Sequence, residues 1–388
     1  MDEVPTETNG PIGFSERRWR VKSLVLRSRV VRFGTLALLM TSVLVAPAWS
    51  QGRDDVRPAS RKAGEVVQSR TLVNQRRLVQ DALDKGLRYL SSRQQSGGAI
   101  GVRYKVAVSS LAGLAVLGAG HLPGQGPHSP TLMGCLRYLE GIGRTSGYLN
   151  ESGDGESRMH GHCYAILFLT QLAGTLPKEK ELSVTRLIES GVQVIENAQS
   201  SEGGWYYSAR NNDKDEASVT VCALQAMRAA RNVGAHVDSF RIKQALRYVK
   251  RCQHSDGSVA YSLKEPGRRT FALTAAAVST LNAAGVYESP ELHKGLRFLH
   301  RRLAKHPKAP WRVAENEYPY YANLYAAQAF HQDDGEVWHE WYPAIRKQLL
   351  STQRQDGSWA SNFGDEYGTA MALLILEVPL GYLPIFQR

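Results

Sequence analysis

The sequence predicts an all-α fold: six helical hairpins closed into an (α/α)6 barrel, or toroid, with concentric inner and outer rings of helices. Two observations predict it: a repeat of about fifty residues and, within each repeat, an amphipathic segment followed by an apolar one. Hydrophobic residues make up 43 % of the chain, which is typical of a packed globular protein and excludes a disordered one.

The first segment of each repeat is a variant of GLRYLSSRQ, the sequence at 86–94. Its apolar residues recur at helical spacing and its Lys and Arg residues fall on the other side, which predicts an outer helix. In four copies the segment ends in a Gln, and a glycine turn follows. The copies are 86–94, 135–143, 191–199, 245–253, 295–303 and 345–353.

The second segment of each repeat is rich in Ala and Leu and is apolar nearly all round, which predicts a helix buried on every side. Several copies end in Gly, the usual C-terminal stop of a helix. An open superhelix would leave one side of this layer in water, so the pattern favours a closed barrel. The copies are 107–120, 163–174, 217–234, 270–285, 321–331 and 369–378.

These repeats resemble the prenyltransferase and squalene-oxidase repeat, whose QW motif is a Gln followed, after a short gap, by Gly-x-Trp. The segments 191–205 and 345–359 match it, whereas 86–98 and 245–259 keep the Gln and Gly without the Trp. The resemblance covers about 80–388 and implies an α/α toroid like that of the terpene cyclases. It also implies structural roles for Gln199, Trp205, Gln253, Gln353 and Trp359.

The positive charge is concentrated before the repeats. The formal net charge is +12, and residues 1–77 hold 14 Lys and Arg against 7 Asp and Glu. Basic residues between 17 and 32 precede an apolar run at 33–45 and then small residues, which is the order of a secretory export signal. The run is shorter than the roughly 20 residues that a spanning helix needs. An uncleaved signal that remains as a membrane anchor is the alternative.

We therefore predict an export signal or anchor over 1–50, a basic flexible linker over 51–77 and the toroid over 78–388. The protein is expected in the periplasm or cell envelope, with membrane contact through its N-terminal segment. The repeats contain no basic stripe interleaved with aromatic residues, so nucleic acid is not an expected partner.

The segment 203–224 resembles the squalene-hopene cyclase region in which Gly-Gly-Trp precedes an Asp-x-Asp-Asp motif at the start of an inner helix. The resemblance places Asp215 on the proton-donating Asp, Asp213 on the first Asp and Glu216 on the last. Three neighbouring carboxylates repel one another when ionised, so the pKa of one rises and that group stays protonated. This sequence departs from the motif in Glu216 and in its shorter connecting loop. The alternative is a helix N-cap formed by Asp213 or Asp215.

The segment 156–167 loosely resembles the Asp-x-Cys-Tyr that opens an inner helix and binds zinc in protein prenyltransferase β subunits. His160, His162 and Cys163 are residue types that bind zinc. The acid and Cys of that family fall on His160 and His162, and its third ligand has no match. The alternative is that the histidines hydrogen-bond the acids, which makes His162 a candidate member of the acid system. No cofactor is expected, with zinc as the alternative.

The turns before the inner helices are expected to converge on one mouth of a central cavity. Aromatic faces there could stabilise a carbocation, or the residues could simply pack at the rim. The residues predicted to line the cavity are His160, Trp205, Tyr207, Tyr320, Tyr321 and Tyr367.

Three functions remain open from the sequence. The first is a terpene cyclase-like isomerase that protonates an isoprenoid with a carboxylic acid. The second is a non-catalytic toroid that binds a lipid or a peptide, and the third is a zinc-dependent prenyltransferase-like transferase. Triterpene cyclases of this resemblance seat their substrate between two barrels, whereas this chain has one. A small hydrophobic or isoprenoid ligand is the expected partner.

Overall fold

The computed structural model describes residues 58–152, 154, 158–211, 213–307 and 309–387, with side chains described from residue 73 onward. The chain divides into two units, and the second, 60–388, holds the toroid. No helix in the described ranges is both long enough and apolar enough to cross a membrane.

The first helix, α1 (Pro58–Ser92), begins well before the first predicted segment. The predicted signal, 1–50, lies outside the described residues. The predicted flexible linker, 51–77, is helical in the structure from residue 58 onward. Between residues 59 and 85 the chain contains no Pro and one Gly, Gly64, and is rich in the strong helix formers Ala, Leu, Gln, Lys and Arg.

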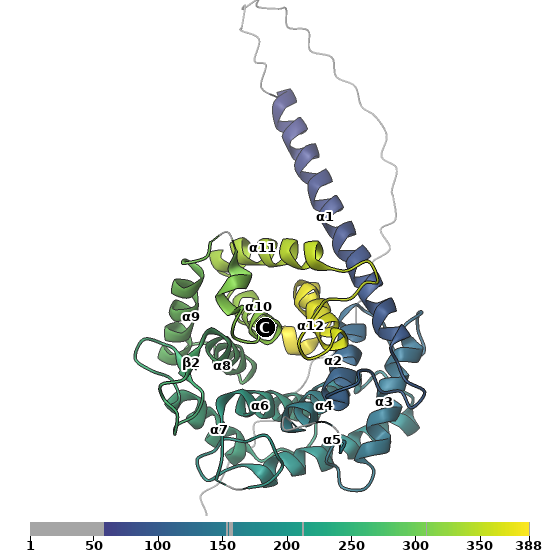
Figure 1. Cartoon of the computed structure of the whole chain (residues 1–388), viewed down its shortest axis with the longest axis vertical. Coiled ribbons are helices and arrows are strands. Elements are labelled where there is room, and N and C mark those ends of the chain that lie inside the picture. Colours follow the sequence, from purple (N-terminus) through teal and green to yellow (C-terminus); the bar gives the residue numbers. More distant parts are fainter. Residues whose placement is uncertain (1–57, 153, 155–157, 212, 308, 388) are drawn as a thin grey trace, which may run out of the picture. The chain divides into compact units, whose positions relative to one another are not determined.

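Six helices form a closed inner ring (Figure 1). Each contacts the next along the chain, and the last, α12, contacts the first, α2, which closes the ring. Burial explains their composition: 12 of the 13 residues of α8 are buried. The inner helices are α2 (Lys105–Gly118), α4 (Arg158–Leu172), α6 (Ala217–Asn232), α8 (Phe271–Ala283), α10 (Pro319–Asp333) and α12 (Asp365–Glu377).

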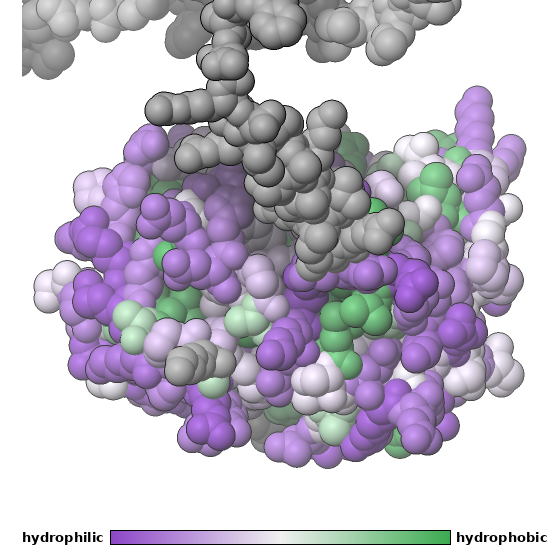
Figure 2. All heavy atoms as spheres, turned by 90° about the horizontal axis from the view of Figure 1, so that it is seen from above, coloured by the Kyte–Doolittle hydropathy of each residue, from purple (hydrophilic) through white to green (hydrophobic). Residues whose placement is uncertain are grey.

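The other six helices surround this ring (Figure 1). They bury one side only, as α7 does with Ile242, Ala245, Tyr248 and Val249. The opposite side is polar, and the side view in Figure 2 shows a mostly hydrophilic surface with scattered apolar residues. The outer helices are α1, α3 (Ser129–Gly143), α5 (Lys178–Ala198), α7 (Ser239–Arg251), α9 (Pro290–Leu303) and α11 (Glu336–Thr352).

Short elements complete the described chain. Strands β1 (Val259–Ala260) and β2 (Arg269–Thr270) pair antiparallel before α8. Turns of 3-10 helix follow α9 and α12: η1 (Pro310–Ala314), η2 (Val378–Leu380) and η3 (Pro384–Phe386). The predicted six-hairpin α/α toroid with concentric rings is confirmed.

The repeated glutamines join neighbouring repeats. Gln353 Nε2 donates to the carbonyl of Gly357 in its own turn at 3.0 Å and to the carbonyl of Ala82 in α1 at 2.9 Å. This second bond links the last repeat to the first, 271 residues away. Gln94, Gln199 and Gln253 make the same pair of bonds, each to the turn glycine and to the next outer helix.

Candidate functional site

A cavity of about 370 Å³ lies within the inner ring. All six inner helices and the C-terminal tail contribute to its lining, and the tail with η3 lies over the middle of the ring (Figure 1). The apolar part of the wall holds Leu111, Leu114, Leu167, Leu324, Leu374, Ile385 and Phe386. This volume is within the range of about 300–1,000 Å³ typical of small-molecule sites.

The cavity opens at the C-terminal ends of the inner helices. The exposed residues in its lining are Asn232, Val233 and Tyr287, which lie at or just beyond those ends, and Pro384 and Gln387 in the tail that follows α12. The sequence predicted a mouth at the opposite end, among the turns before the inner helices, whereas this cavity opens at the C-terminal ends. None of the residues predicted to line the cavity lies in its wall.

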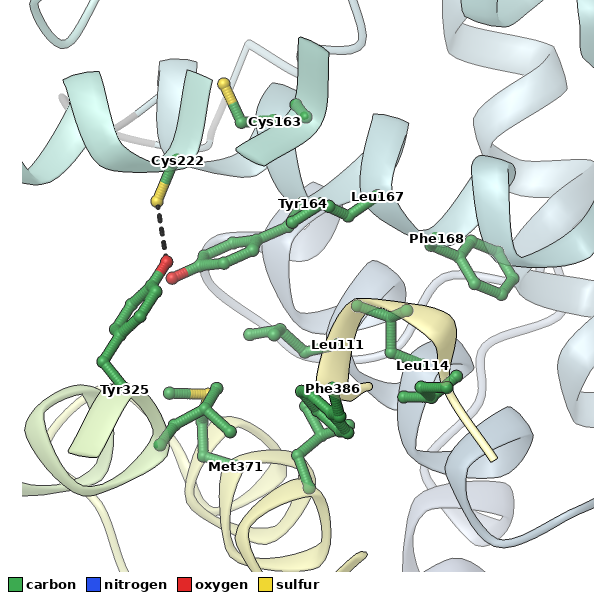
Figure 3. Close-up of a cluster of buried hydrophobic side chains, with 14 of the residues drawn as sticks. Leu111, Leu114, Cys163, Tyr164, Leu167, Phe168, Cys222, Tyr325, Met371 and Phe386 are labelled. Atoms are coloured by element: carbon green, nitrogen blue, oxygen red, sulfur yellow. Dashed lines mark hydrogen bonds between the residues drawn. The ribbon is translucent and has the colours of Figure 1, made fainter. Parts of the chain in front are cut away.

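Aromatic side chains close the cavity toward the N-terminal ends of the inner helices. Tyr164 and Tyr325 are 7 % and 1 % exposed and point toward each other across the ring (Figure 3). The Tyr325 hydroxyl donates to Gln225 Oε1 at 3.2 Å and lies 3.4 Å from Cys222 Sγ. These two side chains form the aromatic floor of the cavity. Burial raises the pKa of both tyrosines, so both hydroxyls are uncharged.

A band of polar side chains crosses the cavity above this floor. Ser279 Oγ donates to Gln328 Oε1 at 3.0 Å, and Gln225 Nε2 lies 3.4 Å from that same oxygen. These residues come from α8, α10 and α6. Arg228 lies one turn beyond Gln225 on α6 and is the one charged residue in the described lining. The sequence offered a signal for it, because Gln225 and Arg228 are large polar residues in the middle of a predicted inner helix.

The predicted acids lie outside this cavity, and each has different surroundings. Asp213 is exposed, has a left-handed backbone with φ 55°, and accepts a bond from Ser201 Oγ at 3.1 Å. Asp215 is 7 % exposed; Tyr248 on α7 donates to its Oδ1 at 2.7 Å and Ser200 to its Oδ2 at 2.9 Å. The Asp215 carboxylate is therefore directed to an outer helix, with both oxygens bonded.

Glu216 is the acid with a raised pKa. Its side chain is fully buried and caps α6, accepting bonds from the backbone of Ser218 at 2.8 Å and of Val219 at 2.6 Å. Burial raises its pKa to about 7, against the effect of these hydrogen bonds and of Arg268. The expected N-cap thus exists, but Glu216 forms it, and Asp213 and Asp215 do not.

His160 reaches Glu216 through a serine. The Ser218 hydroxyl donates to Glu216 Oε1 at 2.7 Å, and His160 Nε2 lies 3.1 Å from the Ser218 oxygen. Burial lowers the pKa of His160 to about 4, so the ring is neutral. With Ser218 donating to the carboxylate, Nε2 carries the ring proton, and the buried Nδ1 is an acceptor without a partner in the described ranges of the chain.

His162 has a different environment. Its Nδ1 accepts from the Leu149 backbone at 3.1 Å, and its Nε2 donates to the Gly191 carbonyl of α5 at 3.0 Å. Burial lowers its pKa to about 4 and raises that of Cys163 well above the usual range. Among the residues that the structure describes, no three His, Cys, Asp or Glu side chains form a group that could hold a metal ion.

The predicted aromatic residues lie near the N-terminal ends of the inner helices, outside the cavity lining. Trp205 is fully buried against its outer helix, and its Nε1 donates to the Ile195 carbonyl at 2.6 Å. Tyr321 comes nearest to the cavity, because its ring centroid is 4.7 Å from that of Tyr325. The others are bonded nearby: Tyr207 to Tyr261 at 2.7 Å, Tyr320 to the Ala360 carbonyl at 3.0 Å, and Tyr367 through its ring to Tyr320 and Phe363.

Comparison with known proteins agrees with this architecture. Residues 168–321 match the squalene-hopene cyclase C-terminal domain family. Two structures of variants of the type II terpene cyclase MstE from Scytonema, in complex with geranylgeranyl dihydroxybenzoate as substrate, are 13 % identical to this chain. For each, the TM-score is 0.52 over 81 % of this chain and 99 % of that one.

A crystal structure of a protein from Actinoplanes is also similar, with 13 % identity and a TM-score of 0.51 over 79 % of this chain and 99 % of that one. No curated protein matches the sequence. Identity this low shows the fold alone. The chain has a terpene cyclase-like α/α toroid.

Proposed function

We propose that this toroid binds an isoprenoid or a similar apolar chain in the cavity at the C-terminal ends of its inner helices. The observation that carries the proposal is the lining: leucines and aromatic residues form its apolar part, and no Asp, Glu or His among the described residues belongs to it. Such a site removes apolar surface from water, which stabilises the complex by about 25 cal/mol per Å². The MstE structures support the choice of ligand, because a chain of the same fold holds a geranylgeranyl compound.

The cavity volume limits the size of the ligand. A volume of 370 Å³ holds roughly a dozen groups of the size that a water molecule occupies in the liquid, about 30 Å³ each. This favours a chain of roughly ten to fifteen carbons and disfavours a triterpene. The single barrel is no obstacle to binding, because the MstE chains match this fold over 99 % of their length.

Binding is favoured over acid-initiated cyclisation by the position of the acids. Protonation of an alkene requires a carboxylic acid within contact distance of the ligand. Glu216 precedes Gln225 by nine residues on α6, about 13 Å along the helix axis. The aromatic floor of Tyr164 and Tyr325, with Tyr321 packed beneath Tyr325, lies toward that same end.

Cyclisation is the second candidate function, and one observation favours it. Glu216 has a pKa of about 7, so a large fraction is protonated near neutral pH, and His160 is joined to it through Ser218. This arrangement resembles an acid with a supporting base. It would act only on a ligand that passes the aromatic floor.

Ligand binding by the purified full chain tests the proposal. We expect farnesol to bind, and Leu167→Phe to weaken binding at least tenfold, because the larger ring fills the cavity. The matched control is Leu182→Phe on α5, whose side chain is 53 % exposed and should leave affinity unchanged. Titration calorimetry measures affinity, and gas chromatography of the recovered ligand identifies any isomer.

Equal affinity of the two variants, or no binding at all, would contradict the proposal. Recovery of a cyclised isomer, lost in Glu216→Gln, would establish the second function instead.

We also propose that the protein is exported by its N-terminal segment, as the charge and apolar run of 1–50 indicate. Cell fractionation of the full chain tests this, and recovery from the cytosol alone would contradict it.

A further inference from the structure

Among the described residues, the cavity lining contains one charged side chain, that of Arg228, with which a purely apolar ligand would form no hydrogen bond or ion pair. Arg228 is the sole charged residue of the described lining, and it lies in the last two turns of α6, near the mouth. The remaining polar lining residues are neutral: Tyr164, Thr170, Gln171, Gln225, Asn232, Asn282, Tyr287, Tyr325, Gln328 and Gln387.

Arg228 has no anionic partner within the described part of the chain. None of the ion pairs there includes it, and its Nε is buried without a hydrogen bond. Burial, followed by the nearby Arg231, lowers the pKa of its guanidinium. A partly buried guanidinium whose Nε donates no hydrogen bond lowers the stability of the fold. An anion that accepts this hydrogen bond would remove that penalty.

The chemistry of the guanidinium defines the missing group. Its planar donors match the two oxygens of a carboxylate or a phosphate, and such charge-assisted bonds are about twice as strong as neutral ones. Side-chain amides of Gln171, Asn232 and Asn282 line the same part of the cavity and can donate further bonds. The carboxyl ends of the inner helices carry partial negative charge, so an anion would be unfavourable here without a cation such as Arg228.

We propose that the ligand of this cavity is amphipathic: a short prenyl or alkyl chain with a carboxylate or phosphate head group bound by Arg228. The head group lies at the mouth, and the chain runs between the leucines toward Tyr164 and Tyr325. The inference rests on the proposed function and adds the polarity and the orientation of the ligand.

The experiment compares ligands that share one chain and differ in the head group. Farnesol, farnesoic acid and farnesyl phosphate are titrated into the full-length protein. We expect at least one of the two anions to bind tenfold or more tightly than farnesol, and its advantage to decrease with salt. Whichever anion is preferred identifies the head group as a carboxylate or a phosphate.

Two variants assign the preference to a residue. Arg228→Gln should remove the preference, so that the preferred anion binds within about twofold of farnesol in that variant, and Arg228→Lys should keep part of it. The matched control is Arg231→Gln, an exposed cation three residues further on α6, which should keep the preference. Thermal melting confirms that each variant is folded.

The inference is overturned if farnesol binds as tightly as both anions, or if Arg228→Gln retains the preference. Either result would assign Arg228 to stabilisation of the α6 carboxyl end. Those outcomes leave the proposed function intact, because farnesol still binds. Absence of binding for all three ligands would contradict the proposed function itself.

Discussion

Glu216 and Asp215 are neighbours in the chain, but their carboxyl groups enter different environments. Tyr248 and Ser200 fix Asp215 toward the outer layer, whereas Glu216 turns back to cap α6. The sequence predicted an acid with a raised pKa within this motif, and such an acid exists. Which of the three it is depends on partners as distant as Tyr248, 33 residues further along the chain, and no local pattern shows them.

Glu377 is a second buried acid that sequence reasoning missed. It ends α12 and is 1 % exposed, and neither of its carboxyl oxygens has a hydrogen-bond partner among the residues that the structure describes. Burial raises its pKa well above the usual value, so the side chain is protonated and neutral. Its Oε2 lies so close to Gly118 that a β-carbon there would be 2.2 Å away, which leaves no room for a larger residue.

This acid makes the stability of the protein depend on pH. Above about pH 4.5 the unfolded chain releases the Glu377 proton, while the folded chain keeps it. The free energy of unfolding therefore falls as pH rises from that value toward the folded-state pKa. We expect Glu377→Gln to raise the melting temperature by a few degrees at pH 8 and by less at pH 4.

Melting curves of the wild type and Glu377→Gln at both pH values measure the effect. Glu216 shifts stability in the same direction but is present in both proteins, so the difference isolates Glu377. An equal change in melting temperature at pH 4 and pH 8 would contradict this account.

At the scale of the elements, acidic residues at the N-terminal end of the inner ring serve as caps. Asp154, from the loop before α4, accepts bonds from the first two backbone amides of α2 at 2.6 and 3.2 Å. Glu317 accepts from Phe271 at 2.7 Å and Ala272 at 3.3 Å, at the start of α8. Together with Glu216 on α6, these caps satisfy backbone donors that burial would otherwise leave unpaired. Helix capping therefore accounts for these acids at the N-terminal ends of the inner helices, and a catalytic role is not needed to explain them.

The glycine turns allow neighbouring outer helices to approach closely. Gly357 has φ +91°, and a β-carbon there would lie 2.4 Å from the carbonyl oxygen of Lys85 on α1. The repeat pattern predicted this turn from the sequence, because Gln and Gly recur at fixed spacing. Its role in closing the ring required the structure, since Lys85 belongs to the opposite end of the chain.

We expect Gly357→Ala to lower the free energy of unfolding by about 1–3 kcal/mol, because it adds backbone strain and a clash at the ring closure. Urea denaturation measures the change. Gly267→Ala is the matched control, because no atom lies within 4 Å of a β-carbon there and its φ is not positive. Equal stability of the two variants would show that the closure does not depend on Gly357.

At the scale of the whole molecule, the repeat pattern predicted the fold, and the structure revealed which end of the barrel is open. The spacing of apolar residues shows which helices are buried on every side and which on one side only, and this is enough to predict two concentric rings. It does not report where side chains leave a gap. Tyr164, Tyr325 and Tyr321 lie on the side of the cavity where the mouth was expected, and the cavity opens at the other end.

The central claim is that the ligand lies at the carboxyl ends of the inner helices. A crystal structure of the full chain with farnesoic acid tests it most directly. The account predicts electron density for the chain between Leu111, Leu167 and Phe386, with the carboxylate on Arg228. Density beside Glu216 and His160, beneath the aromatic floor, would contradict the account and favour cyclisation.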